Sequence, residues 1–328
     1  MSSSGASRAL FQAVNGNSEA STSASSLTPA LFKRLHPGPF LQKFLDSNVR
    51  PDGRPAGHAA GQSAYRDVSI NTGSISTAPS SALVRFGKTT LVCGITLETA
   101  PPDITTPHAG FIVPNVDLSP LCSGKFRPGP PSDEAQALTT RLRDILIASN
   151  VLPLSALVIE PGKAAFVVYL DVVCLNYDGG VLDAAVLACS AALKNLKLPK
   201  ATWDPDKQTT GCNVDETGTA VPVSHVPVSV SFGAVNGHLL PDPTQFETTL
   251  CSSQITVTLS LPLSSTTSRR RVDNRAKLVA ISQLGAAISR GSTTQTDGGT
   301  TVAGADQLKA CISLARTRAQ TLLEIMQQ

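Results

Sequence analysis

The residues best placed to do chemistry are Asp178-Gly179-Gly180, which separate an apolar run from an alanine-rich run. Residues 166–175 are almost all apolar and rich in β-branched types, which predicts a buried strand. Residues 182–193 repeat Ala and Leu at helical spacing with almost no charge, which predicts a buried helix directly after the turn. The free N–H groups at such a helix N-terminus can bind an anion such as phosphate.

Two interpretations of this turn remain open, a phosphate cradle and a close-packed turn. The glycines are free to adopt positive φ in either case. Val181 and Leu182 follow them, and no Lys, Arg, Ser or Thr stands beside them. Because no neighbouring residue offers a cation, we favour the close-packed turn.

The composition is that of a globular protein and gives little indication of its ligand. The chain has 328 residues, of which 41% are hydrophobic and 16% are charged. Its formal net charge of +3 is too small to argue for nucleic-acid binding by itself. One Trp and three Tyr leave few aromatic platforms on which bases could stack. No apolar run reaches the length of a membrane span, so we expect no membrane partner.

The seven cysteines form no CxxC pair and are scattered along the chain. They are predicted to be buried free thiols of a reducing compartment rather than disulfides or zinc ligands. The histidines at 58, 108, 225 and 238 show no ligand spacing. We therefore expect neither a metal nor another cofactor.

The first half of the chain, about residues 31–198, is predicted to form one lobe after a disordered or extended tail over residues 1–30. Its first expected elements are a short helix at 31–48, broken by Pro37 and Pro39, and strands at 66–71, 81–86 and 89–96. A long Pro- and Gly-rich loop at 101–131, a helix that begins at Ser132, and then the central strand and helix follow.

The second half, about residues 199–328, is predicted to repeat this plan. It begins with a linker that carries the only Trp, followed by a strand pair at 221–235 and a type I′ turn at Asn236-Gly237. A strand at 253–261, a loop at 264–277 with three consecutive arginines, a last strand near 278–288 and a helix at 304–328 complete it. The fold class is therefore α/β (α+β), with two similar lobes of mixed sheets packed on helices.

Five stretches of the sequence resemble the RNase PH superfamily, and within it the ring subunits of the eukaryotic RNA exosome. They are RPDGR at 50–54, NTGSISTAPSSALVRFGKTTLVCGI at 71–95, PNVDLSPLCSGKFRPGPPSDEAQ at 114–136, LDVVCLNYDGGVLDAA at 170–185 and LPDPTQFE at 240–247. The resemblance covers roughly residues 40–325. It implies an RNase PH-like fold, of the ribosomal protein S5 domain 2-like type.

The resemblance also implies where a catalytic site would lie. Active members of the family cleave RNA from its 3′ end with inorganic phosphate as the nucleophile. Where they place two phosphate-binding arginines, this chain has Pro131 and Leu182. Where they place two aspartates six residues apart, as general acid and magnesium ligand, it has Asp242 and Thr248.

These replacements predict that the chain does not carry out phosphorolysis. An attacking phosphate is repelled by the negative RNA backbone unless guanidinium groups offset the charge. Loss of one such donor slows enzymes by roughly 10²–10³-fold, and Pro131 and Leu182 supply none. Asp242 beside Thr248 is a poor magnesium site, so we expect Asp242 to be a turn residue before Pro243.

The resemblance instead implies a non-catalytic ring subunit that acts as a scaffold and threads RNA to an associated nuclease. The implied partners are other RNase PH-like ring subunits, S1/KH cap subunits, a 3′–5′ exoribonuclease and single-stranded RNA, in the nucleus, nucleolus and cytoplasm. Lys125 and Arg127 are the candidate RNA contacts, although a solvated loop explains them equally well. Arg141 and Arg143 are expected to form surface or interface ion pairs. The alternative is an active phosphate-dependent exoribonuclease whose site is shared with a neighbouring subunit.

Overall fold

The structure is a computed structural model that describes residues 28–56, 64–207, 209–213, 218–263, 276–285 and 304–327. Its helices are α2 (Pro29–Leu35), α3 (Pro37–Asp46), α4 (Asp133–Ser149), the 3₁₀ helix η1 (Leu154–Leu157), α5 (Val181–Asn195), α6 (Gln245–Thr248) and α8 (Gly304–Gln327). Its strands are β1 (Val68–Thr72), β2 (Ser80–Phe86), β3 (Thr89–Ala100), β4 (Phe111–Asp117), β5 (Val158–Glu160), β6 (Ala164–Asn176), β7 (Lys197–Leu198), β8 (Lys200–Asp204), β9 (Thr209–Asn213), β10 (Thr219–Ala220), β11 (His225–Val235), β12 (His238–Pro241), β13 (Ser253–Pro262) and β14 (Lys277–Gly285).

Each half of the chain supplies one main sheet, which confirms the predicted mixed α/β fold class. In the first half the strand order is β1-β2-β3-β6-β4, and β5 also pairs with β6. The β4–β6 pair is parallel and the other pairs of this sheet are antiparallel. The second sheet has the order β12-β11-β13-β14 and is antiparallel throughout. Two short pairs, β7 with β10 and β8 with β9, lie outside these sheets.

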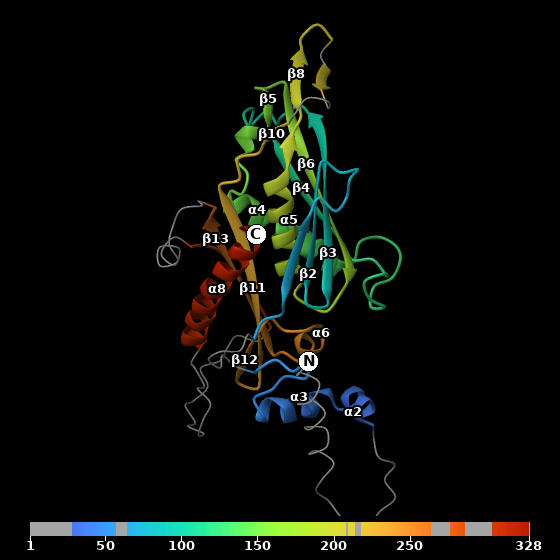
Figure 1. Ribbon diagram of the computed structural model, residues 1–328, viewed down its shortest axis with the longest axis vertical. Helices are drawn as coiled ribbons and strands as arrows, with labels where there is room; N and C mark the ends of the chain where they lie inside the picture. Colours follow the sequence, from blue (N-terminus) through green and yellow to red (C-terminus); the bar gives the residue numbers. More distant parts are fainter. Residues whose placement is uncertain are drawn as a thin grey trace, which may run out of the picture.

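Helix α5 lies between the two sheets (Figure 1) and contacts β2 and β3 on one side and β11 on the other. Every residue from Val181 to Leu193 is buried, as expected for a helix that is apolar on all faces. A single hydrophobic cluster runs from the first sheet through α5 to the second sheet and α8. The Asp178-Gly179-Gly180 turn therefore enters the core at the point where the two halves of the chain meet.

Local sequence signals account for several element boundaries. The side chain of Ser132 caps α4 by accepting a hydrogen bond from the backbone N–H of Ala135. Asn236 and Gly237 have φ of 46° and 84° and join β11 to β12, as the type I′ turn requires. The predicted helix at 31–48 is two helices, α2 and α3, because Pro37 begins a new helix at its first position.

The long loop predicted at 101–131 is wrong in part, because it contains strand β4. This strand pairs with the central strand β6 along its whole length. Pro114, which lies inside β4, argues against a strand at the level of sequence. Proline is tolerated there because β4 is an edge strand, so the missing N–H breaks no hydrogen bond on the open side.

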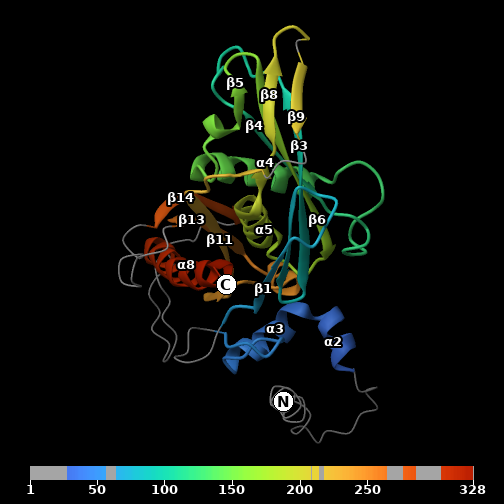
Figure 2. The ribbon, with the colours of Figure 1, turned by 45° about the horizontal axis from the view of Figure 1, so that its top comes forward.

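Two predictions in the second half are also wrong. The strand pair predicted at 221–235 is largely one strand, β11, in which Pro227 stands opposite Ser260. Strand β12 pairs only with residues 232–235 of β11, so Pro227 has no neighbouring strand on that edge. The N–H group that proline lacks is therefore not needed there. The linker with the only Trp is a hairpin of β8 and β9, in which Trp203 pairs with Thr210. This hairpin extends from one end of the molecule, and α2 and α3 lie at the other (Figure 2).

All seven cysteines are free, as predicted, but they are not all buried. Cys212 is exposed and Cys251 is half-buried, whereas the other five are buried. No helix among the described residues is long and apolar enough to span a membrane. Residues 1–27 of the predicted tail, most of the 264–277 loop with its three arginines, and the 291–301 loop lie outside the described residues. The tail was predicted to reach residue 30, but helix α2 already begins at Pro29.

Candidate functional site

A cleft of about 420 Å³ opens beside the glycine turn, at the N-terminal end of α5. It brings together Leu182, Thr248, Lys125 and Arg141, four positions that the sequence analysis singled out. Asp242, Pro131 and Arg127 are not part of its lining. The lining residues that matter below are Lys125, Glu134, Arg141, Tyr177, Ser231, Gln245, Thr248, Thr249 and Gln254.

The two glycines of the turn are required by both conformation and space. Gly179 and Gly180 have φ of 78° and 67°. A Cβ atom on Gly179 would lie 2.8 Å from the backbone nitrogen of Gln245, and one on Gly180 would lie 2.6 Å from Nη2 of Arg66. Protein atoms therefore pack directly against the turn, in agreement with a close-packed turn.

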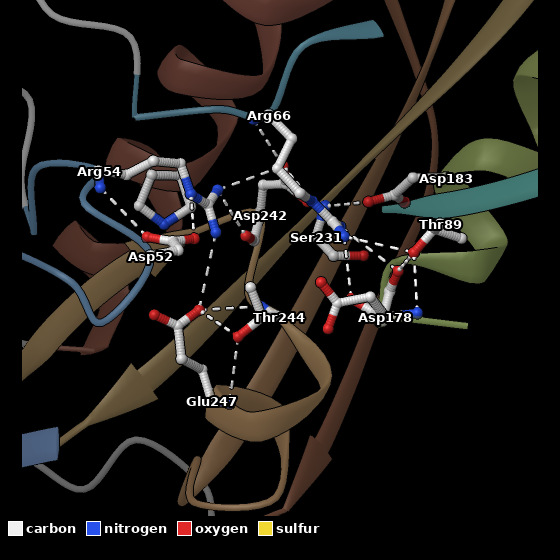
Figure 3. Close-up of polar contacts among 12 residues, drawn as sticks. Asp52, Arg54, Arg66, Thr89, Asp178, Asp183, Ser231, Asp242, Thr244 and Glu247 are labelled. Carbon is white, nitrogen blue, oxygen red and sulfur yellow. Dashed lines mark hydrogen bonds and ion pairs between the residues drawn. The ribbon is translucent and has the colours of Figure 1, made fainter. Parts of the chain in front are cut away.

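Arg66 is the cation nearest the turn, and it binds the turn's carbonyl groups rather than a ligand. Its guanidinium donates to the carbonyl oxygens of Asp178 at 2.9 Å and Gly179 at 3.3 Å (Figure 3). Thr89 Oγ1 also donates to the carbonyl of Gly179, at 2.8 Å. The sequence analysis missed Arg66, since it lies 112 residues before Asp178 in the chain.

Asp242 is a turn residue, as expected, with a φ of 51°, but it is also a buried ion-pair partner. Its carboxylate is 2% exposed and accepts hydrogen bonds from the backbone N–H and the guanidinium of Arg66. Arg54 Nη1 donates to the same carboxylate at 3.4 Å. Burial alone would raise the pKa of Asp242, but the hydrogen bonds and charges of Arg66 and Arg54 outweigh it and hold the pKa below its usual value.

The neighbouring acid, Glu247, is also paired with a buried arginine. Arg50, which is fully buried, donates to Glu247 through Nε at 3.0 Å and Nη2 at 3.1 Å. The backbone N–H of Thr244 also donates to Glu247, at 2.8 Å, in a capping box that begins α6. We call Arg50, Arg54, Arg66, Asp242 and Glu247 the arginine clamp, because they join the N-terminal segment to the second half of the chain.

Asp183, in the first turn of α5, is a buried acid that sequence reasoning did not single out. It is 3% exposed, and its Oδ2 accepts a hydrogen bond from the backbone N–H of Ser231 at 2.9 Å. Its Oδ1 is buried without a hydrogen-bond partner among the described residues. Burial, followed by the nearby charge of Asp242, raises the pKa of Asp183 to about 6.

The four basic residues that the sequence analysis discussed, Lys125, Arg127, Arg141 and Arg143, have different surroundings in the structure. Lys125 lies in the cleft and forms an ion pair with Glu134. Arg141 also lines the cleft, and no side chain of the described residues forms an ion pair with it, so a surface or interface pair stays a prediction. Arg143 is exposed and lies 3.8 Å from Asp144, as expected for a surface pair. Arg127 is exposed and outside the cleft.

Comparison with known proteins agrees with this geometry. Two family models match, the 3′ exoribonuclease family domain 1 over residues 64–199 and domain 2 over residues 225–318. The chain belongs to the RNase PH family of 3′ exoribonucleases.

Relatives of this RNase PH-family chain are components of exosomes. It is 43% identical to the exosome complex component rrp43 of Schizosaccharomyces pombe, over 72% of this chain and 84% of that protein. It is 38% identical to the exosome complex component Rrp42 of Thermococcus gammatolerans, over 59% of this chain and 70% of that protein.

Solved structures of the RNase PH family have the same fold. A chain of the Archaeoglobus fulgidus exosome with RNA bound to the active site superposes with a TM-score of 0.66 at 28% identity. That match covers 87% of this chain and 96% of the other. A chain of an archaeal exosome core superposes with a TM-score of 0.64 at 25% identity, over 88% and 96% of the two chains.

Proposed function

We propose that this chain is a non-catalytic RNase PH-like subunit of an exosome core ring, where it is a scaffold around the path of RNA to a separate nuclease. The exosome components among its relatives support the assembly, and the state of Asp242 supports the lack of catalysis. The further partners we propose are neighbouring ring subunits, S1/KH cap subunits and a 3′–5′ exoribonuclease, in the nucleus, nucleolus and cytoplasm.

Asp242 is the single observation that carries the non-catalytic assignment. A general acid must hold a proton at the working pH, and a magnesium ligand must offer a free oxygen. Both oxygens of Asp242 accept hydrogen bonds from Arg66, and its pKa is lowered. The carboxylate therefore has neither a proton to give nor an oxygen free of hydrogen bonds.

The apolar side chain of Leu182 supports the same assignment. Leu182 lies at the cleft at the position where the family resemblance places an arginine. A phosphate dianion gains nothing from an aliphatic side chain and loses its water on entering the cleft. Arg66 cannot replace the missing arginine, because its guanidinium is bound to Asp242 and to the turn carbonyls.

A second candidate function is phosphorolysis at a site shared with a neighbouring subunit. Lys125 and Arg141 favour it, since they keep two cations in the cleft. The two functions differ in their dependence on this chain's own carboxylate. Only the catalytic alternative requires Asp242 to leave the arginine clamp.

The test is phosphate-dependent release of nucleoside diphosphates from a 3′-tailed RNA, with magnesium, by the full chain reconstituted with its ring neighbours. A conservative Asp242→Asn variant and a Leu182→Ala variant are assayed beside the unaltered chain in rings of confirmed composition. We expect equal release from all three rings. Release that falls with Asp242→Asn, in a ring that still assembles, would support the catalytic alternative. Failure of the chain to co-purify with any ring subunit would contradict the scaffold role.

A further inference from the structure

Glu134 binds two other side chains of the cleft at once. Its Oε2 forms an ion pair with Nζ of Lys125, and its Oε1 accepts a hydrogen bond from the hydroxyl of Tyr177 at 2.7 Å. The ammonium group of Lys125 also lies 5.6 Å from the ring centroid of Tyr177. We call Lys125, Glu134 and Tyr177 the cleft latch.

The latch is accessible to a ligand. The side chains of Lys125 and Glu134 are 51% and 35% exposed, so the ion pair lies at the edge of the cleft in contact with solvent. Exposed ion pairs are weak because solvent screens them, so a competing anion can open this one. Tyr177 is half-buried and holds Glu134 from the other side, which fixes the carboxylate beside Lys125.

We propose that Glu134 limits the affinity of this cleft for the phosphodiester backbone of single-stranded RNA by competing with RNA phosphates for Lys125. The inference rests on the proposed function, in which RNA passes along the chain. An RNA phosphate brings the same charge to Lys125 that Glu134 already supplies, and so it must displace or share that carboxylate. The cleft then holds RNA weakly, which suits a strand that has to keep moving.

Arg141 supplies the charge that keeps the cleft attractive to RNA. Lys125, Arg141 and Glu134 are the charged residues of the lining, so one positive charge is left after Glu134 offsets Lys125. Removal of the carboxylate would leave two uncompensated cations. The predicted gain in RNA affinity therefore depends on Lys125, whereas the basal affinity depends on Arg141.

The uncharged part of the lining favours RNA over an acidic protein segment. Thr248 offers a hydroxyl group and Gln245 an amide, whereas the side chains of Ser231, Thr249 and Gln254 already form hydrogen bonds within the protein. Hydroxyl and amide groups donate to phosphate and ribose oxygens without reading the base sequence. An acidic peptide is the competing occupant, and the experiment below includes it.

The test compares the full chain with its Glu134→Gln variant in binding to a fluorescent uridine homopolymer over a salt series. We expect Glu134→Gln to bind about 2- to 5-fold more tightly at low salt, the size of an exposed ion pair. The slope of log affinity against log salt should steepen by about 0.7, as one more cation meets a phosphate. The matched control is Glu160→Gln, which removes an exposed ion pair with Lys163 outside the cleft and should change neither quantity.

Three results would overturn the inference. One is equal RNA binding by Glu134→Gln and Glu160→Gln, including no binding by either. Another is tighter binding that persists when Lys125→Ala is added to Glu134→Gln. The third is a gain that appears for a polyglutamate peptide and not for RNA.

The latch has a second readout that does not involve RNA. Burial raises the pKa of Tyr177, and the hydrogen bond and charge of Glu134 raise it further. Glu134→Gln should therefore lower the pKa of Tyr177, so that its phenolate absorbance appears at a lower pH. The Tyr177→Phe variant identifies which part of the absorbance comes from Tyr177. A lowered pKa of Tyr177 with unchanged RNA affinity would contradict this inference and leave the scaffold role intact. Failure of ring assembly would contradict the scaffold role alone.

Discussion

At the residue scale, the charged groups beside the glycine turn are bound to one another. Arg66 and Arg54 are close to the glycine turn, but both are paired with Asp242. Arg50 is paired with Glu247. The guanidinium and carboxylate groups of this region therefore neutralise one another inside the protein and join its N-terminal segment to its second half.

The arginine clamp predicts a large loss of stability for Asp242→Asn. The amide keeps the shape of the side chain but leaves the buried guanidinium of Arg66 uncompensated, so we expect the free energy of unfolding to fall by about 3–5 kcal/mol. Urea unfolding of the full chain measures it. The control is Asp144→Asn, an exposed acid beside Arg143, which should cost less than about 1 kcal/mol. Similar small losses for both variants would contradict the clamp.

The raised pKa of Asp183 predicts that the free energy of unfolding depends on pH in a way that the Asp183→Asn variant lacks. Its pKa is raised from 3.8 to about 6, so the folded state binds this proton more tightly than the unfolded state. The resulting stabilisation is full below pH 4 and is lost as the pH rises through 6, by an amount on the order of 3 kcal/mol. Asp183→Asn should therefore gain stability relative to the unaltered chain between pH 4 and pH 7, in urea unfolding at each pH. If the two chains differ in free energy of unfolding by the same amount at pH 4 and pH 7, the prediction is wrong.

At the element scale, the join between β6 and α5 is the most constrained part of the fold. The two glycines turn the chain from the central strand into the buried helix, and the backbone carbonyls of the turn are bound by Arg66 and Thr89. A side chain at either glycine would meet protein atoms at less than van der Waals distance.

This constraint predicts a difference between two Gly→Ala substitutions. Gly53 has a φ of 88° with no atom within 4 Å of an added Cβ, so Gly53→Ala should lose only the cost of positive φ, about 1–2 kcal/mol. Gly180→Ala should lose roughly 1–3 kcal/mol more, because the new methyl group must displace the guanidinium of Arg66. Thermal or urea unfolding of both variants measures the difference. Equal losses would mean that Arg66 moves away freely.

Local sequence patterns predicted most elements, and their failures have physical causes. The α5 helix, the β11–β12 hairpin and the start of α4 were predictable, because periodicity, Asn-Gly and Ser132 act within a few residues. Strand β4 was missed because Pro114 is a strand breaker except at a sheet edge, and edges are set by tertiary structure. The same holds for Pro227 in β11, whose open side is set by the short length of β12.

At the scale of the whole molecule, the candidate site depends on contacts that no local pattern reports. Arg66 and Asp242 are 176 residues apart, and Arg50 and Glu247 are 197 apart. The sequence predicted that Leu182 and Thr248 share a site, since the family resemblance aligns them. It did not predict that Asp242 is paired with Arg54 and Arg66, and the signal in the sequence was the arginine-rich stretch at 50–66.

The charged groups on the two sides of the Gly179-Gly180 turn differ in their pairing and in their exposure to solvent. On one side of it the charged groups of the arginine clamp are paired with one another, and on the other the cleft keeps Lys125 and Arg141 near solvent. This division is what we expect of the proposed scaffold subunit, in which RNA meets the cleft and the arginine clamp serves stability.

The central claim is that the turn at Gly179-Gly180 no longer binds phosphate. It is tested most directly by calorimetric titration of inorganic phosphate into the purified full chain. We predict no saturable binding up to about 10 mM, which corresponds to less than roughly 3 kcal/mol of binding free energy. Saturable binding at lower concentration that is abolished by Gly180→Ala in a folded variant would contradict the account.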